Sequence, residues 1–220
     1  MEWLLHAGDA VDGRLFDVGT FTQRLVDLRD AGGGHDADEI LYVLEGNGSL
    51  DIAGERHALR PGISVFAGAG TTWSADGGAR AVSVLVHDPD ASTACAVVDM
   101  DAVAKGTATA GREFVLGATP AVGCMSATQF IGLIPPGRAP NHFHRYEEVI
   151  YVLEGEGRLE IGGESEPIGP GSCIHLPRTL VHALANTGKS ELRVLGVFRP
   201  AGSPAEAYYP DGTLATVPDS

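Results

Sequence analysis

The feature that most constrains this chain is that it contains the same stretch twice. EILYVLEGNG at 39–48 recurs as EVIYVLEGEG at 148–157, an offset of 148 − 39 = 109 residues. The pair Pro61-Gly62 recurs as Pro170-Gly171, and 170 − 61 is again 109. An internal repeat that keeps one offset without a gap indicates two copies of one structural unit.

Each copy has the pattern of short strands joined by tight turns. Residues 148–153 are rich in Val, Ile and Tyr, the turn Gly155-Glu156-Gly157 follows, and the strand pattern resumes at 159–161. Helical signals are weak, with at most a turn or two at 100–105. Regularly spaced strands without helical periodicity predict an all-β chain that folds as two tandem barrels or sandwiches.

The repeat also predicts the domain organisation. We expect an N-terminal barrel over 1–90, a linker over 91–112, a C-terminal barrel over 113–200 and a tail over 201–220. The proline-containing tail is expected to wrap a surface or to reach another subunit. Because exposed sheet edges need covering, we also expect a homodimer.

Charge and composition exclude several classes of partner. Fifteen basic residues face twenty-nine acidic ones, a formal net charge of −14 that disfavours nucleic acid and anionic membranes. A small anionic substrate stays possible, since a bound cation can reverse the local sign in a pocket. The N-terminus lacks a signal-peptide pattern, no apolar run is long enough to span a bilayer, and the three cysteines form no framework. These features predict a cytoplasmic protein.

A set of potential metal ligands lies in the second copy. His142 and His144 are two residues apart, so in a strand they lie on one face, and Glu148 has the same parity. His182 follows from the next hairpin. Three imidazoles and one carboxylate suit a borderline divalent ion such as Mn, Fe, Co or Ni, whereas zinc would make a closed structural site.

The second copy resembles the two motifs of the cupin superfamily, G-x5-H-x-H-x3,4-E-x6-G and G-x5-P-x-G-x2-H-x3-N. One residue fewer separates Gly137 from His142, and His182 lies further beyond Pro170-Gly171 than the compact motif states. The resemblance implies double-stranded β-helix (jelly-roll) barrels. It also implies one divalent metal ion per chain, held by the matched residues His142, His144, Glu148 and His182.

The first copy departs from the motif. At the offset of 109, His144 corresponds to His35 and Glu148 to Glu39, but His142 corresponds to Gly33 and His182 to Trp73. We therefore expect the N-terminal barrel to be structural or to keep only a vestigial pocket. A buried Glu39 needs a partner, for which His35 is the natural candidate.

Other polar residues are weaker candidates. Four of them could line a metal pocket in a cupin-like barrel, although each is more often a surface or core residue: Arg138, Tyr146, Gln129 and Arg193. An arginine in such a pocket would bind a carboxylate bidentately. Four histidines match neither motif or are expected to pack or face solvent: His175, His6, His57 and His87.

These features predict a metal-dependent enzyme that acts on a small organic acid or phenolic compound. Dioxygenation is the first expectation, followed by isomerisation, decarboxylation or hydrolysis, with Glu148 as a proton acceptor. The competing prediction is a non-catalytic metal-binding or ligand-binding protein, such as a sensor. The sequence identifies neither the metal nor the substrate.

Overall fold

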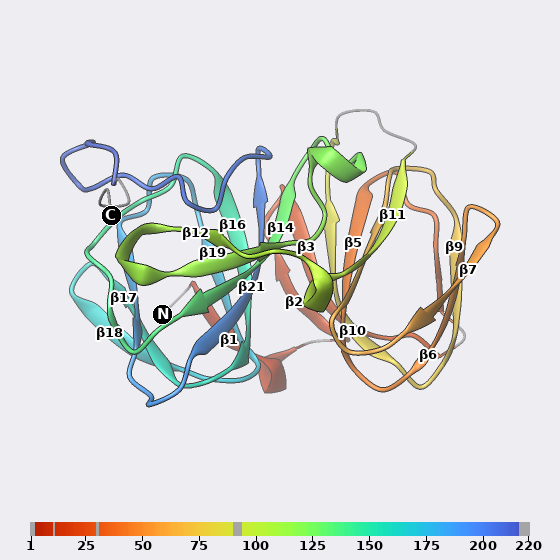
Figure 1. The fold of residues 1–220 in the computed structure, drawn as a ribbon, viewed down its shortest axis with the longest axis horizontal. Helices are drawn as coiled ribbons and strands as arrows, with labels where there is room; N and C mark the ends of the chain where they lie inside the picture. The colour runs from red at the N-terminus through yellow and green to blue at the C-terminus, as the bar shows by residue number, and fades with distance from the viewer. Residues whose placement is uncertain (1–2, 11, 30, 90–93, 216–220) are drawn as a thin grey trace.

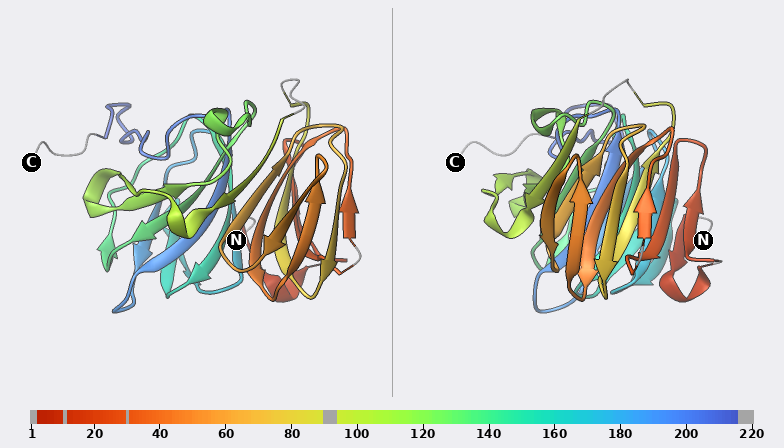
Figure 2. Two further views of the ribbon diagram at one scale, coloured as in Figure 1. Left: turned by 45° about the vertical axis from the view of Figure 1, so that its right-hand side comes forward. Right: turned by 90° about the vertical axis from the view of Figure 1, so that its right-hand side faces the viewer.

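The computed structural model describes residues 3–10, 12–29, 31–89 and 94–215. In Figure 1 these residues form two barrels that stand side by side, and Figure 2 shows the same pair from two further directions. The described helices are single 3-10 turns: η1 (Ala7–Asp9), η2 (Met100–Ala102), η3 (Thr109–Gly111) and η4 (Pro120–Val122). The chain is all-β.

The N-terminal barrel consists of two antiparallel sheets. Its strands are β2 (Arg14–Asp17), β3 (Phe21–Asp27), β4 (Ala31–Gly33), β5 (Asp38–Glu45), β6 (Gly48–Ile52), β7 (Glu55–Leu59), β8 (Ile63–Ala67), β9 (Trp73–Gly77), β10 (Arg80–Val86) and β11 (Cys95–Asp99). The larger sheet has the order β11-β8-β5-β10-β3-β2 and the smaller one β4-β9-β6-β7.

The C-terminal barrel repeats this plan. Its strands are β1 (Leu4–His6), β12 (Gly106–Thr107), β13 (Glu113–Leu116), β14 (Thr128–Ile134), β15 (Gly137–Arg138), β16 (Glu147–Glu154), β17 (Gly157–Ile161), β18 (Glu164–Ile168), β19 (Ser172–Leu176), β20 (His182–Asn186) and β21 (Leu192–Arg199). The sheet orders are β1-β19-β16-β21-β14-β13-β12 and β15-β20-β17-β18.

The offset found in the sequence is reproduced in the strands. The strands β5 and β16 begin at 38 and 147, and β9 and β20 begin at 73 and 182, so both pairs differ by 109. The pairings β8-β5-β10-β3 and β19-β16-β21-β14 are likewise equivalent. The two copies are therefore two jelly-roll barrels of one topology.

The strands at the boundaries differ from the expected division. β1 lies within the expected N-terminal segment 1–90 but pairs with β19 of the C-terminal barrel. The expected linker 91–112 contains β11, which extends the N-terminal sheet, and β12, which pairs with β13. Free strand edges explain the difference, since each offers unpaired backbone groups to a nearby segment. Residues 91–93 and 216–220 of the expected linker and tail lie outside the described residues.

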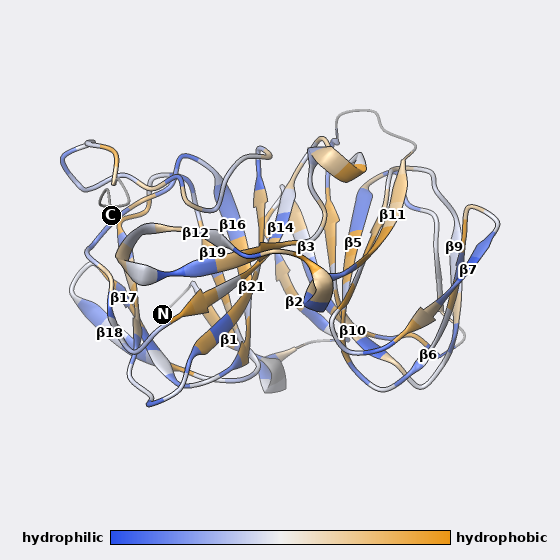
Figure 3. Ribbon diagram, viewed as in Figure 1, coloured by the Kyte–Doolittle hydropathy of each residue, from blue (hydrophilic) through white to orange (hydrophobic). Residues whose placement is uncertain are grey.

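The large sheets are buried on both faces. Along β5, Leu41 belongs to the interior cluster of the N-terminal barrel, whereas Ile40 belongs to a cluster that includes residues of both barrels. β16 alternates in the same way between Ile150 and Val149. Figure 3 shows the resulting hydrophobic strands at the middle of the molecule. Each fully buried Leu or Ile side chain stabilises the fold by about 1.5–3 kcal/mol.

The tail folds onto its own barrel. Tyr208 forms an antiparallel bridge with Phe143, their rings stack at 5.6 Å between centroids, and the Arg145 guanidinium lies 4.1 Å from the Tyr208 ring centroid. This agrees with the expectation that the tail wraps a surface. No helix among the described residues is long and apolar enough to cross a membrane.

Candidate metal centre in the C-terminal barrel

Three histidines converge in the C-terminal barrel. His142 and His144 lie in the segment between β15 and β16, and His182 is the first residue of β20. An isolated antiparallel bridge joins His142 to His182, with N–O distances of 3.0 and 2.9 Å. The expected strand through His142 and His144 is thus reduced to single bridges, but the two side chains still reach one place.

The ligand atoms of these histidines are close enough to hold one ion. One ring nitrogen from each of His142, His144 and His182 lies within 4.8 Å of the other two, which makes them the one such group of His, Cys, Asp or Glu in the described part of the chain. The ring centroids of His142 and His182 are 4.5 Å apart. A pocket that brings three imidazoles this close has the donor set of a divalent metal site.

Each histidine is oriented by a backbone carbonyl. The Nδ1 atoms of His142, His144 and His182 lie 2.9, 2.7 and 2.9 Å from the carbonyl oxygens of Pro140, Glu206 and Leu180 respectively. A carbonyl can only accept a hydrogen bond, so each Nδ1 carries the proton and each Nε2 keeps its lone pair. This tautomer and this second contact are typical of histidines that bind metals.

Burial keeps the histidines neutral. It lowers the pKa of His144 to about 3 and that of His182 well below its usual range, and the neighbouring imidazoles add to both effects. Burial lowers the pKa of His142 as well. All three are therefore uncharged at neutral pH, which is the form that coordinates a metal.

Glu148 faces the same cavity but stands apart from the three nitrogens. Its carboxylate is outside the group within 4.8 Å, and it accepts no hydrogen bond from the described residues. Burial raises its pKa to about 8. Gly196 leaves the room that this carboxyl occupies, because a Cβ there would lie 2.7 Å from Oε1. The structure thus brings three predicted ligands together and places the fourth on the same cavity wall.

The cavity is small and mostly apolar. It has a volume of about 80 Å³, which is room for roughly five to eight water-sized atoms. Among the residues that the sequence put forward, Tyr146 lines it, stacked between His144 at 4.5 Å and Phe198 at 3.9 Å. Burial raises the pKa of Tyr146 well above 10, so its hydroxyl stays protonated.

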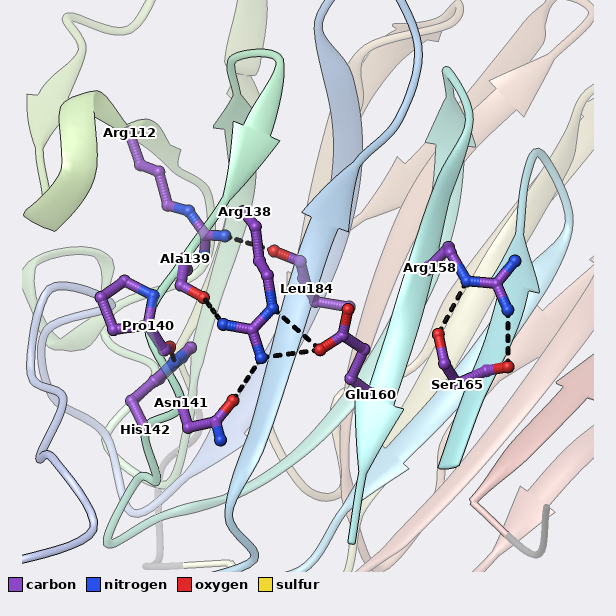
Figure 4. A network of polar contacts seen from close by, with 10 residues as sticks. All are labelled: Arg112, Arg138, Ala139, Pro140, Asn141, His142, Arg158, Glu160, Ser165 and Leu184. Carbon is purple, nitrogen blue, oxygen red and sulfur yellow. Dashed lines mark hydrogen bonds and ion pairs between the residues drawn. The ribbon is translucent and has the colours of Figure 1, made fainter. Parts of the chain in front are cut away.

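The other weak candidates lie elsewhere. Arg138 is ion-paired to Glu160 at 2.7 Å beside the barrel, as Figure 4 shows. Arg193 pairs with Glu154, and Gln129 accepts a hydrogen bond from Ser64 of the other barrel. The four remaining histidines have local partners: His175 with Glu147, His6 with Ser172, His57 with Glu55 and His87 with Thr22.

The sequence did not predict two groups of residues that line the cavity. Arg112, at the end of the expected linker, lines the cavity, and so does the tail through Pro204, Ala205 and Ala207. The Glu206 carbonyl holds His144, but a backbone carbonyl has no sequence signal. Arg112 could have been noticed only as an arginine just before a strand, which is a weak signal.

In the N-terminal barrel the equivalent site is filled. The Trp73 indole donates a hydrogen bond of 3.0 Å to Glu39, and a Cβ on Gly33 would lie 2.1 Å from the indole nitrogen. His35, the expected partner, lies 3.5 Å from Glu39, whereas Ser83 donates at 2.6 Å and Arg24 at 3.2 Å. His35 is thus a secondary contact.

Comparison with known proteins agrees with this architecture. The family model described as "Cupin domain" matches residues 130–198. An L-ectoine synthase from Bordetella parapertussis is 30% identical over 90 residues, which is 40% of this chain and 68% of that protein. The chain belongs to the cupin superfamily.

Two further proteins are similar over shorter stretches. The polyketide synthase CurC from Streptomyces cyaneus is 32% identical over 76 residues, so the match spans about half of CurC (49%) and 34% of this chain. An L-ectoine synthase from Bordetella petrii is 33% identical over 38% of this chain and 63% of its own length.

Solved structures match over most of the chain. The protein Ylba from E. coli superimposes with a TM-score of 0.71 at 15% identity, covering 91% of both chains. A variant of oxalate decarboxylase from Bacillus subtilis gives 0.65 at 12% identity, covering 90% of this chain and 77% of the other. At these identities the likeness supports the fold.

Proposed function

We propose that this cupin is a metal-dependent enzyme with one divalent ion in its C-terminal barrel. The observation that carries the proposal is the orientation of His142, His144 and His182, each with Nδ1 bound to a backbone carbonyl and Nε2 free. Three neutral imidazoles together with the carboxylate of Glu148 suit Mn, Fe, Co or Ni, and three imidazoles alone also suit zinc. Such an ion, when bound, supplies Lewis acidity toward a substrate oxygen.

Glu148 is proposed as the fourth ligand and proton acceptor. Both roles need an ionised carboxylate, and its pKa of about 8 keeps it protonated at neutral pH while burial is the dominant influence. A cation in the cavity favours the charged form and lowers this pKa. Occupancy of the site and ionisation of Glu148 are therefore expected to be coupled.

The reaction is proposed to be non-oxidative. The relatives described above are named as a synthase, a polyketide synthase and a decarboxylase, which favours lyase-type or isomerase-type chemistry. We therefore rank non-oxidative chemistry first and dioxygenation, which was the first expectation from the sequence, second. The small cavity supports a small organic acid as substrate.

The experiment that tests this is reconstitution followed by a substrate screen. Protein loaded separately with Mn, Fe, Co, Ni or Zn is incubated with small oxo-acids, hydroxy acids and catechols, and consumption is followed by NMR alongside oxygen uptake. We expect metal-dependent consumption without oxygen uptake, lost in His182→Ala and kept in His57→Ala, a matched change in the N-terminal barrel. Metal-dependent oxygen uptake would restore dioxygenation. Tight metal binding without turnover of any compound would favour the non-catalytic sensor.

A further inference from the structure

We propose that Arg112 forms a binding site for a carboxylate group in the C-terminal cavity. Its importance for turnover rests on the proposed function, but the binding itself does not depend on a metal. Arg112 lies between η3 and β13 and lines the cavity together with the three histidines. The site therefore combines residues of the barrel with one from the segment that joins the two barrels.

The guanidinium of Arg112 has few partners inside the protein. Its Nη2 donates to the Leu184 carbonyl at 2.8 Å, which is the one acceptor it has among the described residues (Figure 4). An arginine has five N–H donors, so most of them stay available. Arg138 in the same view donates twice to the Glu160 carboxylate, at 2.9 and 2.7 Å.

No carboxylate among the described residues forms an ion pair with Arg112. Glu113 lies 2.8 Å from Lys105, and Glu206 accepts from the Tyr208 hydroxyl at 2.7 Å. Glu148 lines the same cavity, and no ion pair joins it to Arg112 among the described residues. Burial lowers the pKa of Arg112 to about 10, so it keeps its charge at neutral pH. An uncompensated, partly buried cation is costly, and an anionic ligand would reduce that cost.

The shape and lining of the cavity select the anion. A single guanidinium offers a planar fork that matches a carboxylate bidentately. The cavity of about 80 Å³ is small, and Phe114, Phe130 and Val194 form part of its apolar wall. A more highly charged phosphate would lose more hydration in such surroundings. Because the whole chain has a net charge of −14, a local positive charge such as that of Arg112 is needed to attract an anion to this cavity.

This placement defines the substrate class. With its carboxylate on Arg112, a ligand has the rest of its atoms directed into a cavity whose other polar lining includes the three histidines, Tyr146 and Glu148. The ligand that fits is a small carboxylic acid with a second oxygen or nitrogen function. A neutral molecule of the same size leaves the guanidinium unpaired.

The test is ligand binding to the metal-free full-length protein, followed by NMR titration. The probes are malonate, its neutral counterpart malonamide, and inorganic phosphate. We expect malonate to bind at least tenfold more tightly than either of the others. Arg112→Gln should lower malonate affinity at least tenfold, Arg112→Lys should recover part of it, and Arg138→Gln should leave it unchanged.

Three results would overturn the proposal: equal binding of malonate and malonamide, tighter binding of phosphate, or unchanged malonate affinity in Arg112→Gln. Thermal unfolding shows whether each variant is folded, and Arg112→Lys serves as the reporter if Arg112→Gln is not. Because no metal is present, a failure here is distinct from a failure of the metal site. Loss of metal binding with malonate binding intact would count against the proposed enzyme alone.

Discussion

The two barrels share a topology but treat the same interior position in opposite ways. In the N-terminal barrel, Glu39 accepts hydrogen bonds from Arg24, Ser83 and Trp73. In the C-terminal barrel, Glu148 has no hydrogen-bond partner among the described residues, and the three histidines line the same cavity. One barrel satisfies its buried carboxylate internally, and the other leaves its polar groups available.

The strand register shows how this difference arises. Ser83 lies opposite Leu41 and Arg24, and the equivalent residue Gly196 lies opposite Ile150 and Phe130. Two of the three donors to Glu39, Ser83 and Arg24, are therefore replaced beside Glu148 by residues whose side chains cannot donate. A duplicated barrel can lose its ligands without losing stability when new donors satisfy the remaining carboxylate.

The largest expected difference between the two barrels is in how much the protein's stability falls when an interior side chain is removed. Trp73→Ala removes a buried aromatic side chain and should lower the free energy of unfolding by about 3–5 kcal/mol. His182→Ala borders an existing cavity and should cost metal-free protein about 1 kcal/mol, the net value of its hydrogen bond to Leu180. Urea denaturation of both variants measures the two values. Equal costs would contradict the view that one interior is filled and the other open.

In the C-terminal barrel the tail holds His144 through the Glu206 carbonyl, a contact that we use to test how His144 differs from its counterpart His35. Removing residues 203–220 takes away the Glu206 carbonyl that accepts from His144, and should weaken metal binding by about 10–100-fold. Tyr208→Phe keeps the backbone and is the control, expected to bind normally. Competition with a chelator of known affinity measures both. Full affinity after truncation would show that the tail does not position His144. An unchanged mass in solution would separately remove the tail from any homodimer contact.

The smallest effect is on the pH dependence of stability. Because the pKa of Glu148 in the folded state is about 8 against an ordinary 4.5, folded metal-free protein binds more protons, and its stability falls as pH rises toward 8. The lowered pKa values of the three histidines act oppositely and outweigh this effect below about pH 7, because the unfolded histidines bind protons there. We expect a net loss of up to about 0.7 kcal/mol per pH unit between roughly pH 7 and 8.

Glu148→Gln should abolish that loss, whereas Glu156→Gln, a change at an exposed site, should keep it. Chemical denaturation at several pH values gives the slopes. A wild-type curve that is flat over this interval would mean that Glu148 is already ionised in the metal-free protein, which would remove one difference between the two barrels.

Much of this comparison could be predicted from the sequence because the repeat is local and gapless. One offset predicts the strands from β5 to β9 and from β16 to β20, and it also predicts which ligands the first copy lacks. The spacing of two residues correctly predicted that the side chains of His142 and His144 reach the same place. The backbone there forms isolated β-bridges and no regular strand.

The remainder depends on contacts between distant segments. Arg24 and Ser83 reach Glu39 only because β3 and β10 are neighbours, which the sequence does not specify. Arg112 belongs to a segment that was expected to be a linker, and β1 crosses to the other barrel. Free edges and backbone carbonyls are available to any nearby segment, so their partners are decided by the tertiary fold.

The most direct test of the account is metal content per chain, measured by plasma mass spectrometry on tag-free wild type and on His182→Ala. We predict about one equivalent of Mn, Fe, Co or Ni in wild type and its loss in the variant. Two equivalents would contradict the filled N-terminal barrel. No metal after reconstitution, or one equivalent that persists in His182→Ala, would contradict the C-terminal centre.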